Sequence, residues 1–251
     1  MAIPSCLVDT SIPLRITRRS DSLGTMQIES EAKVARKAAT DQKTRDPLRR
    51  LGTMQRRTMK DFEIRVALKH KLSVLHGEDP ETSIVEELGL RHGAIRVDLA
   101  VVNGILHGYE LKSDHDTLYR LPRQCETYGA IFDRVTLVVG RRLAKRAVEM
   151  VPEWWGVELA ESDARGQVQF TKQRHPLENP APDPLAIAKL LWRDEALSLL
   201  IELGQARGVF SKPRSHVYAR LADVSDIEFL RYRVRDRLRN RAGWRVVERR
   251  G

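Results

Sequence analysis

Hydrophobic and polar positions follow two different periods along the chain, and they divide it into helices and strands. In residues 58–75 the apolar side chains Ile64, Leu68, Leu72 and Leu75 recur with a helical period, which predicts a helix with one buried face. Three short apolar segments, typical of strands, follow at 82–90, 95–102 and 105–112. Helices are then expected at about 122–131 and 143–151, and strands at 134–140 and 154–161. This order of elements predicts an α/β fold with a mixed central sheet over residues 58–161.

The segments outside this core have different patterns. Residues 1–57 show no sustained period and are rich in Arg, Lys, Ser and Thr, which predicts a disordered basic leader. Residues 162–182 are polar and contain several prolines, so we interpret them as a linker. Residues 183–251 return to a helical period and form a basic C-terminal region, with one amphipathic helix expected over 183–204 and another within 227–244.

Charge is concentrated at the two ends of the chain, although the net charge of the whole is only +10. Residues 1–60 carry 13 Lys and Arg against 6 Asp and Glu, and residues 205–251 carry 13 against 5. Basic segments of this kind attract polyanions such as nucleic acid. On the C-terminal helix, Arg231, Arg235 and Arg239 form one basic flank that could contact phosphates, and a solvated face with salt bridges is the alternative.

Composition also excludes several classes of protein. No run of 18 apolar residues occurs, so a membrane span is not expected. With only two cysteines, Cys6 and Cys125, a thiolate metal cluster is excluded and a structural disulfide is not expected. A cytoplasmic location is the expectation.

Two carboxylates and an ammonium interrupt the apolar hairpin of residues 96–113. Asp98 lies in its first strand, and Glu110 and Lys112 lie in its second strand. A carboxylate in apolar surroundings is costly unless it is paired or binds a cation, and two neighbouring carboxylates repel each other. A Mg²⁺ ion would resolve this conflict, because it prefers carboxylate and water oxygens and keeps positions open for phosphate. Lys112 would share a face with Glu110 and could orient an attacking water there.

The turn of this hairpin decides whether its charged side chains meet. A two-residue turn would place Asp98 and Glu110 on opposite faces of the sheet. A three-residue loop over 102–104, with Gly104 in a left-handed conformation and a bulge, would pair Asp98 with Gly108 and bring both carboxylates to one face. We predict the three-residue loop. The opposite face is then expected to bury Leu99, Val101, Tyr109 and Leu111.

These residues together resemble the PD-(D/E)xK nuclease superfamily. The matching pattern is Asp98, eleven residues, and then Glu110-Leu111-Lys112, although Val97 stands where the superfamily name has Pro. Gln124 and Tyr128 are similar to the Q-x-x-x-Y element of the RecB-like branch. The resemblance covers about residues 58–161 and implies a restriction-endonuclease-like αβββαβ core.

The resemblance also implies a site and a cofactor. Asp98, Glu110 and the Leu111 carbonyl group would bind Mg²⁺, for which Mn²⁺ could substitute, and Glu63 or Glu87 would add a further ligand. Lys112 would activate the water, and Gln124 and Tyr128 would hold the substrate strand or the ligand carboxylates. Arg120 and Arg123, which come shortly before or next to Gln124, are candidates for phosphate contacts.

The function expected on this basis is metal-dependent hydrolysis of phosphodiester bonds in DNA. RNA stays open as a substrate, as do a homodimer and a protein partner bound through the basic leader. Two rival hypotheses are a catalytically inactive nucleic-acid-binding module and a phage or bacterial interaction protein on the same fold. The residues do not distinguish endonuclease from exonuclease action, and they give neither the preferred DNA structure nor the pathway.

Overall fold

A computed structural model of the chain describes residues 58–241, and the predictions made for the leader 1–57 and for residues 242–251 lie outside this range. In chain order the elements are α2 (Asp61–His76), β1 (Ser83–Leu90), η2 (Arg91–Gly93), β2 (Ile95–Val102), β3 (Leu106–Lys112), α3 (Leu121–Gly129), β4 (Arg134–Gly140), α4 (Arg141–Met150), β5 (Gly156–Ser162), β6 (Val168–Arg174), α5 (Pro184–Ala188), α6 (Arg193–Glu202), α7 (Arg214–Val224) and α8 (Ile227–Asn240). The expected mixed α/β order over 58–161 is confirmed. No helix in the described range is long and apolar enough to cross a membrane.

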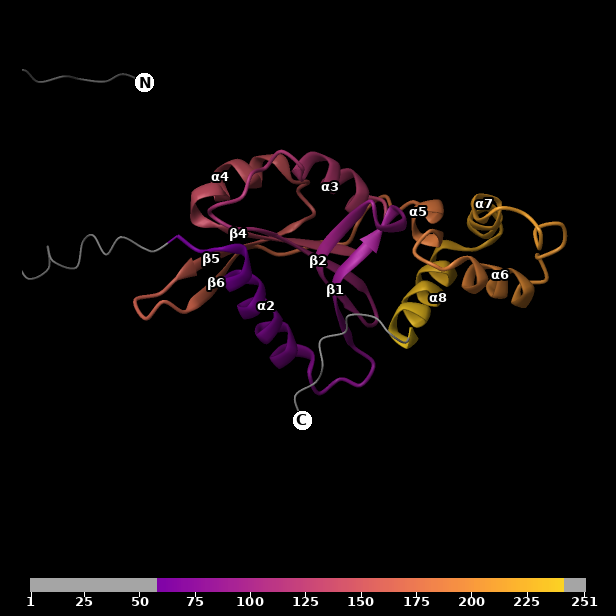
Figure 1. Ribbon diagram of the computed structural model, residues 1–251, viewed down its shortest axis with the longest axis horizontal. Coiled ribbons are helices and arrows are strands. Elements are labelled where there is room, and N and C mark those ends of the chain that lie inside the picture. The colour runs from indigo at the N-terminus through magenta and orange to yellow at the C-terminus, as the bar shows by residue number, and fades with distance from the viewer. Residues whose placement is uncertain (1–57, 242–251) are drawn as a thin grey trace, which may run out of the picture. The chain divides into compact units, whose positions relative to one another are not determined.

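Six strands form one mixed sheet in the order β1-β2-β3-β4-β5-β6. The pairs β1–β2, β2–β3 and β5–β6 are antiparallel, and β3–β4 and β4–β5 are parallel. Helix α2 covers one face of the sheet, and α3 and α4 cover the other (Figure 1). Because both faces are covered, the central strands bury nearly every residue, which explains why strand 134–140 is almost continuously apolar.

Each face has its own hydrophobic core. Under α2, the stripe Ile64, Leu68 and Leu72 packs against a cluster from the sheet. That cluster includes Leu99, Val101, Tyr109 and Leu111, so the set predicted for this face is confirmed. The opposite core is larger and extends from the sheet into the C-terminal helices through residues such as Leu199, Leu221 and Leu230.

The loop of the β2–β3 hairpin differs from the prediction by two positions in register. Val102 pairs with Leu106, so the three-residue loop consists of residues 103–105 rather than 102–104. Asn103 closes it by accepting a hydrogen bond from Ile105 N through Oδ1, at 3.0 Å. Gly104 does not have a positive φ, so the predicted left-handed glycine is wrong. A shift of two residues preserves strand alternation, which is why the predicted faces still hold.

Residues 162–182 are only partly a linker. Val168–Arg174 forms β6, which adds to the edge of the sheet beside β5. Most of its side chains are polar and exposed, so its sequence lacks the apolar signal of a buried strand. The single helix expected over 183–204 is two helices, α5 and α6, and α7 was not predicted at all.

A partly buried polar cluster lies on the α2 side of the sheet. His107 Nε2 lies 2.9 Å from Thr136 Oγ1, and its ring stacks on Tyr109 at a centroid distance of 4.3 Å. Burial, and then the charges of Arg134 and His76, together lower the pKa of His107 to about 3. The folded protein therefore holds this imidazole neutral.

Candidate active site

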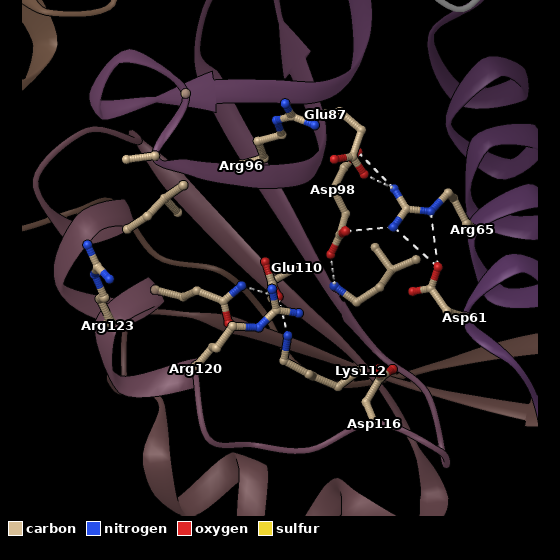
Figure 2. A pocket seen from close by; sticks show the side chains of 15 residues that line it. Asp61, Arg65, Glu87, Arg96, Asp98, Glu110, Lys112, Asp116, Arg120 and Arg123 are labelled. Carbon is tan, nitrogen blue, oxygen red and sulfur yellow. Dashed lines mark hydrogen bonds and ion pairs between the residues drawn. The ribbon is translucent and has the colours of Figure 1, made fainter.

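A cavity of about 530 Å³ opens where α2, the first three strands and α3 meet (Figure 2). Its charged lining residues are Asp61, Glu87, Asp98, Glu110 and Asp116 together with Arg65, Arg96, Lys112, Arg120 and Arg123. Acidic and basic groups are thus equal in number, but they differ in burial and in partners. These differences decide which of them can act on a ligand.

The cavity forms because β2 and β3 separate at this end of the hairpin. Their ladder ends at the pair Leu99–Tyr109, so Asp98 and Glu110 lie just beyond the last paired residues. The Asp98 carboxylate replaces the missing strand partner, since its Oδ2 accepts a hydrogen bond from Leu111 N at 2.8 Å. Asp98 is thereby fixed beside Glu110 by the backbone of the neighbouring strand.

Glu87 is held in the cavity by an unusual backbone conformation. Its φ is +52°, although the register between β1 and β2 is continuous on both sides of it. At this residue β1 changes the face that it presents: Val85 before it and Leu88 after it enter the same hydrophobic core. A positive φ is rare in a non-glycine residue and is often found at functional sites. Of the two strand glutamates, Glu87 therefore reaches the cavity, as predicted, while Glu86 pairs with Lys69 outside it.

Glu110 lies at the base of the cavity and is oriented by three side chains. Its Oε1 accepts hydrogen bonds from Lys112 Nζ and from Gln124 Nε2, the latter at 2.6 Å. Its Oε2 lies 2.6 Å from the Tyr128 hydroxyl group, which is also 2.9 Å from the Arg96 carbonyl oxygen. Glu110 is 1% exposed, Lys112 4% and Tyr128 0%. The carboxylate thus has a fixed position in a region of low dielectric constant, where a nearby charge acts strongly.

Gln124 has one unsatisfied atom in this arrangement. Its Oε1 is buried and has no hydrogen-bond partner among the described residues. The amide cannot simply be reversed, because Glu110 Oε1 needs the N–H group. The cavity therefore offers a free acceptor beside Glu110, suited to a water molecule or to a donor on a ligand.

The negative charge of the Asp98 carboxylate is only partly compensated by its surroundings in the folded protein. Burial and then the charge of Glu110 raise the pKa of Asp98 to about 7, and Arg65 offsets only part of this rise. Arg65 NH2 lies 2.6 Å from Asp98 Oδ1, and its NH1 lies 2.8 Å from Glu87 Oε1. Burial alone would lower the pKa of Arg65, but the charges of Asp98 and Asp61 raise it overall, so the guanidinium stays charged.

Three arginines at the edge of the cavity have no such partners. The side chains of Arg96, Arg120 and Arg123 are exposed, and none forms an ion pair or a hydrogen bond with another residue in the part of the chain that is described. Arg120 and Arg123 come from the start of α3, where Figure 2 shows them on the side of the cavity away from Arg65. Guanidinium groups in this state can bind an anionic ligand without losing an internal ion pair.

Most of the predicted site residues meet at this cavity. Those that line it are Glu87, Asp98, Glu110, Leu111, Lys112, Arg120, Arg123 and Gln124, and Tyr128 contacts it through Glu110. Glu63 does not line the cavity. Its Oε2 accepts a hydrogen bond from Lys60 N at 2.9 Å and caps the start of α2, so the structure does not bring it to the other predicted ligands.

The arginines predicted to contact phosphates from α8 are bound within the protein instead. Arg231 is 8% exposed and lies in a buried ion pair with Asp133, with Nε–Oδ1 at 2.6 Å. Arg235 NH1 lies 3.1 Å from the same carboxylate, and Arg239 pairs with Glu81. Their spacing on one flank of the helix serves packing against the core rather than an open basic surface.

Asp61 and Arg65 are site residues that sequence reasoning missed. They are four residues apart on α2 and form an ion pair of 3.3 Å on the flank that faces β1 and β2. An acidic and a basic residue at this spacing are common on exposed helix faces, so the pattern alone gives no sign of a site. Asp61 and Arg65 differ from Glu63 only in that they lie on the flank of α2 that faces the cavity. The packing of α2 on the sheet decides which flank that is.

No group of three or more His, Cys, Asp or Glu side chains in residues 58–241 is arranged to hold a metal ion. Of the predicted ligands, the cavity brings together the carboxylates of Asp98 and Glu110 and the strand backbone around Leu111. Such a set suits Mg²⁺ or Mn²⁺, because Mg²⁺ keeps several waters and binds proteins through one or two carboxylates. The raised pKa of Asp98 and the free Gln124 Oε1 also fit a hydrated cation.

Comparison with known proteins found a matching family and similar individual proteins. A family model described as Bacteriophage P4 protein cII matches residues 54–246. Protein cII of Enterobacteria phage P4 is 30% identical over 99 residues, which are 39% of this chain and 37% of that protein. The match therefore spans little more than a third of the phage protein. A protein of unknown function from Silicibacter pomeroyi superimposes with a TM-score of 0.32 at 16% identity, covering 59% of this chain and 92% of that one.

Proposed function

The chain belongs to the family of Bacteriophage P4 protein cII, and from the geometry of its cavity we propose that it is a metal-dependent nuclease that acts on DNA. The observation that carries the proposal is the joint placement of Asp98, Glu110 and Lys112 in one cavity. Gln124 and Tyr128 support it, since both hold the Glu110 carboxylate. This arrangement is the one that the PD-(D/E)xK resemblance implies.

A divalent metal ion would be held by Asp98, Glu110 and the Leu111 carbonyl oxygen. When bound, it would polarise the phosphate and lower the pKa of a water molecule. In the proposed reaction the water oxygen forms a bond to phosphorus, the bond from phosphorus to the leaving sugar oxygen breaks, and the leaving oxygen takes up a proton. The products are a phosphate monoester and a free hydroxyl group.

The chain's own residues supply charge and orientation to this reaction. The Lys112 ammonium lies in the buried base of the cavity, where it can position the water and stabilise charge on the phosphate. Gln124 and Tyr128 fix the Glu110 carboxylate, so that no reorganisation is needed when the ligand binds. Arg96, Arg120 and Arg123 would bind the phosphates on either side of the scissile bond.

A non-catalytic nucleic-acid-binding module is the second candidate, and a specific observation favours it. Asp98 already lies in an ion pair with Arg65, and Glu110 in one with Lys112, so each carboxylate has a cationic partner without a metal ion. A protein that only binds DNA would need the exposed arginines but no cation at the carboxylates. The nuclease would cleave DNA when a metal ion is present, whereas the binding module would leave the DNA intact.

Cleavage of labelled single-stranded, duplex and flapped DNA tests the proposal, with Mg²⁺, Mn²⁺ or EDTA. The wild type would be compared with Lys112→Ala and with the matched control Lys145→Ala, which removes an exposed lysine from α4. We expect metal-dependent products from the wild type and the control. The Lys112 variant should lose at least about 100-fold in rate, as is typical when an electrostatic or acid–base group is removed.

Circular dichroism and DNA binding would be measured on the same samples, because Lys112 is buried. Products that do not depend on metal, or a folded Lys112→Ala protein that cleaves at the wild-type rate, would contradict the proposal. DNA binding by the wild type without cleavage of any substrate would support the binding module instead.

A further inference from the structure

Arg65 occupies the part of the cavity where a cation would approach Asp98. Its guanidinium contacts three carboxylates at once: Asp98 Oδ1 at 2.6 Å, Glu87 Oε1 at 2.8 Å and Asp61 Oδ2 at 3.3 Å. It also lies 3.4 Å from the Asp98 carbonyl oxygen. Figure 2 shows the guanidinium between these acids, on the α2 side of the cavity.

The remaining oxygen of Asp98 is also in use. Oδ2 accepts the Leu111 N–H group, which comes from the strand backbone and is not free to move. Oδ2 keeps one lone pair beside this bond, whereas a metal ion that binds Asp98 through Oδ1 must share or take the oxygen that Arg65 now contacts. Arg65 can move more easily than the backbone, because its long side chain extends from the surface of α2 and is 19% exposed.

We propose that Arg65 is an internal counter-cation that a divalent metal ion displaces from Asp98, so that this residue sets the metal concentration at which the site fills. The inference rests on the proposed function, which supplies the divalent metal ion at Asp98. In the absence of metal, Arg65 is the shared cationic partner of the three acids. When the ion binds, the guanidinium keeps Glu87 and Asp61 as partners and releases Asp98.

Metal binding without DNA tests this inference directly. Mn²⁺ and Mg²⁺ would be titrated by calorimetry into the full-length wild type, Arg65→Gln and the matched control Lys69→Gln. Lys69 lies one turn after Arg65 on α2 and pairs with Glu86, the neighbour of Glu87 in β1, but it does not line the cavity. Loss of a charge-assisted hydrogen bond to the competing cation should tighten metal binding by about tenfold or more in Arg65→Gln. The control should stay within about twofold of the wild type.

A second measurement uses the unaltered protein, since Arg65→Gln leaves three acids without their partner and could reduce folding. In protein with ¹⁵N-labelled arginine, the Arg65 side-chain Nε–H resonance should shift as diamagnetic Mg²⁺ saturates the site. It would be assigned by its absence from Arg65→Lys. An Arg65 resonance that is unchanged at saturating Mg²⁺ would overturn the inference.

The outcomes also separate this inference from the proposed function. Metal binding that is equal or weaker in Arg65→Gln than in the wild type would overturn the role of Arg65, and metal-dependent cleavage would still stand. If neither protein binds a divalent ion, then both the nuclease proposal and the displacement of Arg65 are wrong.

Discussion

Asp133 connects the C-terminal helices to the sheet, and its replacement should reveal what the arginine-rich helix does. Its carboxylate is 3% exposed and accepts hydrogen bonds from Leu106 N at 2.6 Å, from Arg231 Nε at 2.6 Å and from Arg235 NH1 at 3.1 Å. Asp133→Ala removes all of these interactions at once. Arg231 then keeps only glutamate partners whose side chains are exposed.

The size of the effect follows from this burial. Removing one partner of a buried ion pair costs about 3–5 kcal/mol, because the other charge stays buried without compensation. Stability is usually about 5–15 kcal/mol in total, so the loss is a large part of it. For a domain of this size it corresponds to a fall in Tm of roughly 10 °C.

Urea denaturation of Asp133→Ala, Arg231→Met and the double variant would measure this. The matched control is Arg237→Gln, which breaks a more exposed pair with Glu202 and should cost under about 1 kcal/mol. In the double variant much of the loss should be recovered, since the uncompensated charge is gone. A cost below about 1 kcal/mol for Asp133→Ala would refute the structural role of Arg231. In that case its charge would again be available to explain contacts with nucleic acid.

Two further predictions concern the pH dependence of stability and the packing at the start of α4. The folded state keeps the pKa of His107 near 3, whereas the same side chain in the unfolded chain has a pKa of about 6.5. The unfolded state therefore gains a proton first as pH falls. Below pH 6.5 the free energy of unfolding should drop by up to about 1.4 kcal/mol per pH unit. Urea denaturation from pH 7 to about 4.5 should show a shallower slope for His107→Gln but not for the exposed His115→Gln, and equal slopes would contradict this. Gly140→Ala should cost about 1–3 kcal/mol, because its Cβ would lie 2.6 Å from Asp114 Oδ1, which also caps α4. Gly104→Ala, with open space around its Cβ, is the control in thermal denaturation, and an equal loss in both variants would argue against the steric explanation.

The core of the fold could be predicted from sequence because its elements bury strong periodic patterns. The strand over 134–140 is almost wholly buried, and its apolar run has no other reasonable structure. Strand β6 could not be predicted, because an edge strand that exposes most of its residues needs no apolar pattern. The break between α5 and α6 was missed for a different reason: the apolar period continues across it, and only the capping of Trp192 N by Glu195 shows the new start.

The site residues that lie on one hairpin could be predicted from the sequence. Those that reach the cavity because of how a helix packs on the sheet could not. Asp98, Glu110 and Lys112 could be placed together because strand alternation survives a two-residue error in the loop. The flank of α2 that faces the cavity could not be chosen from the period alone, so Glu63 was selected and Arg65 was missed. The arginines of α8 show the same limit, since no sequence pattern distinguishes a phosphate contact from a buried partner such as Asp133.

The left-handed backbone at Glu87 has a consequence for how this protein can change. A glutamate with a φ of +52° is less stable there than glycine or asparagine would be, by about 1 kcal/mol. The same conformation turns the carboxylate toward Arg65 and reverses the side of β1 that enters the core. Stability and site geometry therefore favour different residues at position 87. Selection for thermostability alone would tend to remove the glutamate, whereas the ion pair with Arg65 requires it, so this position is where the two effects can be separated.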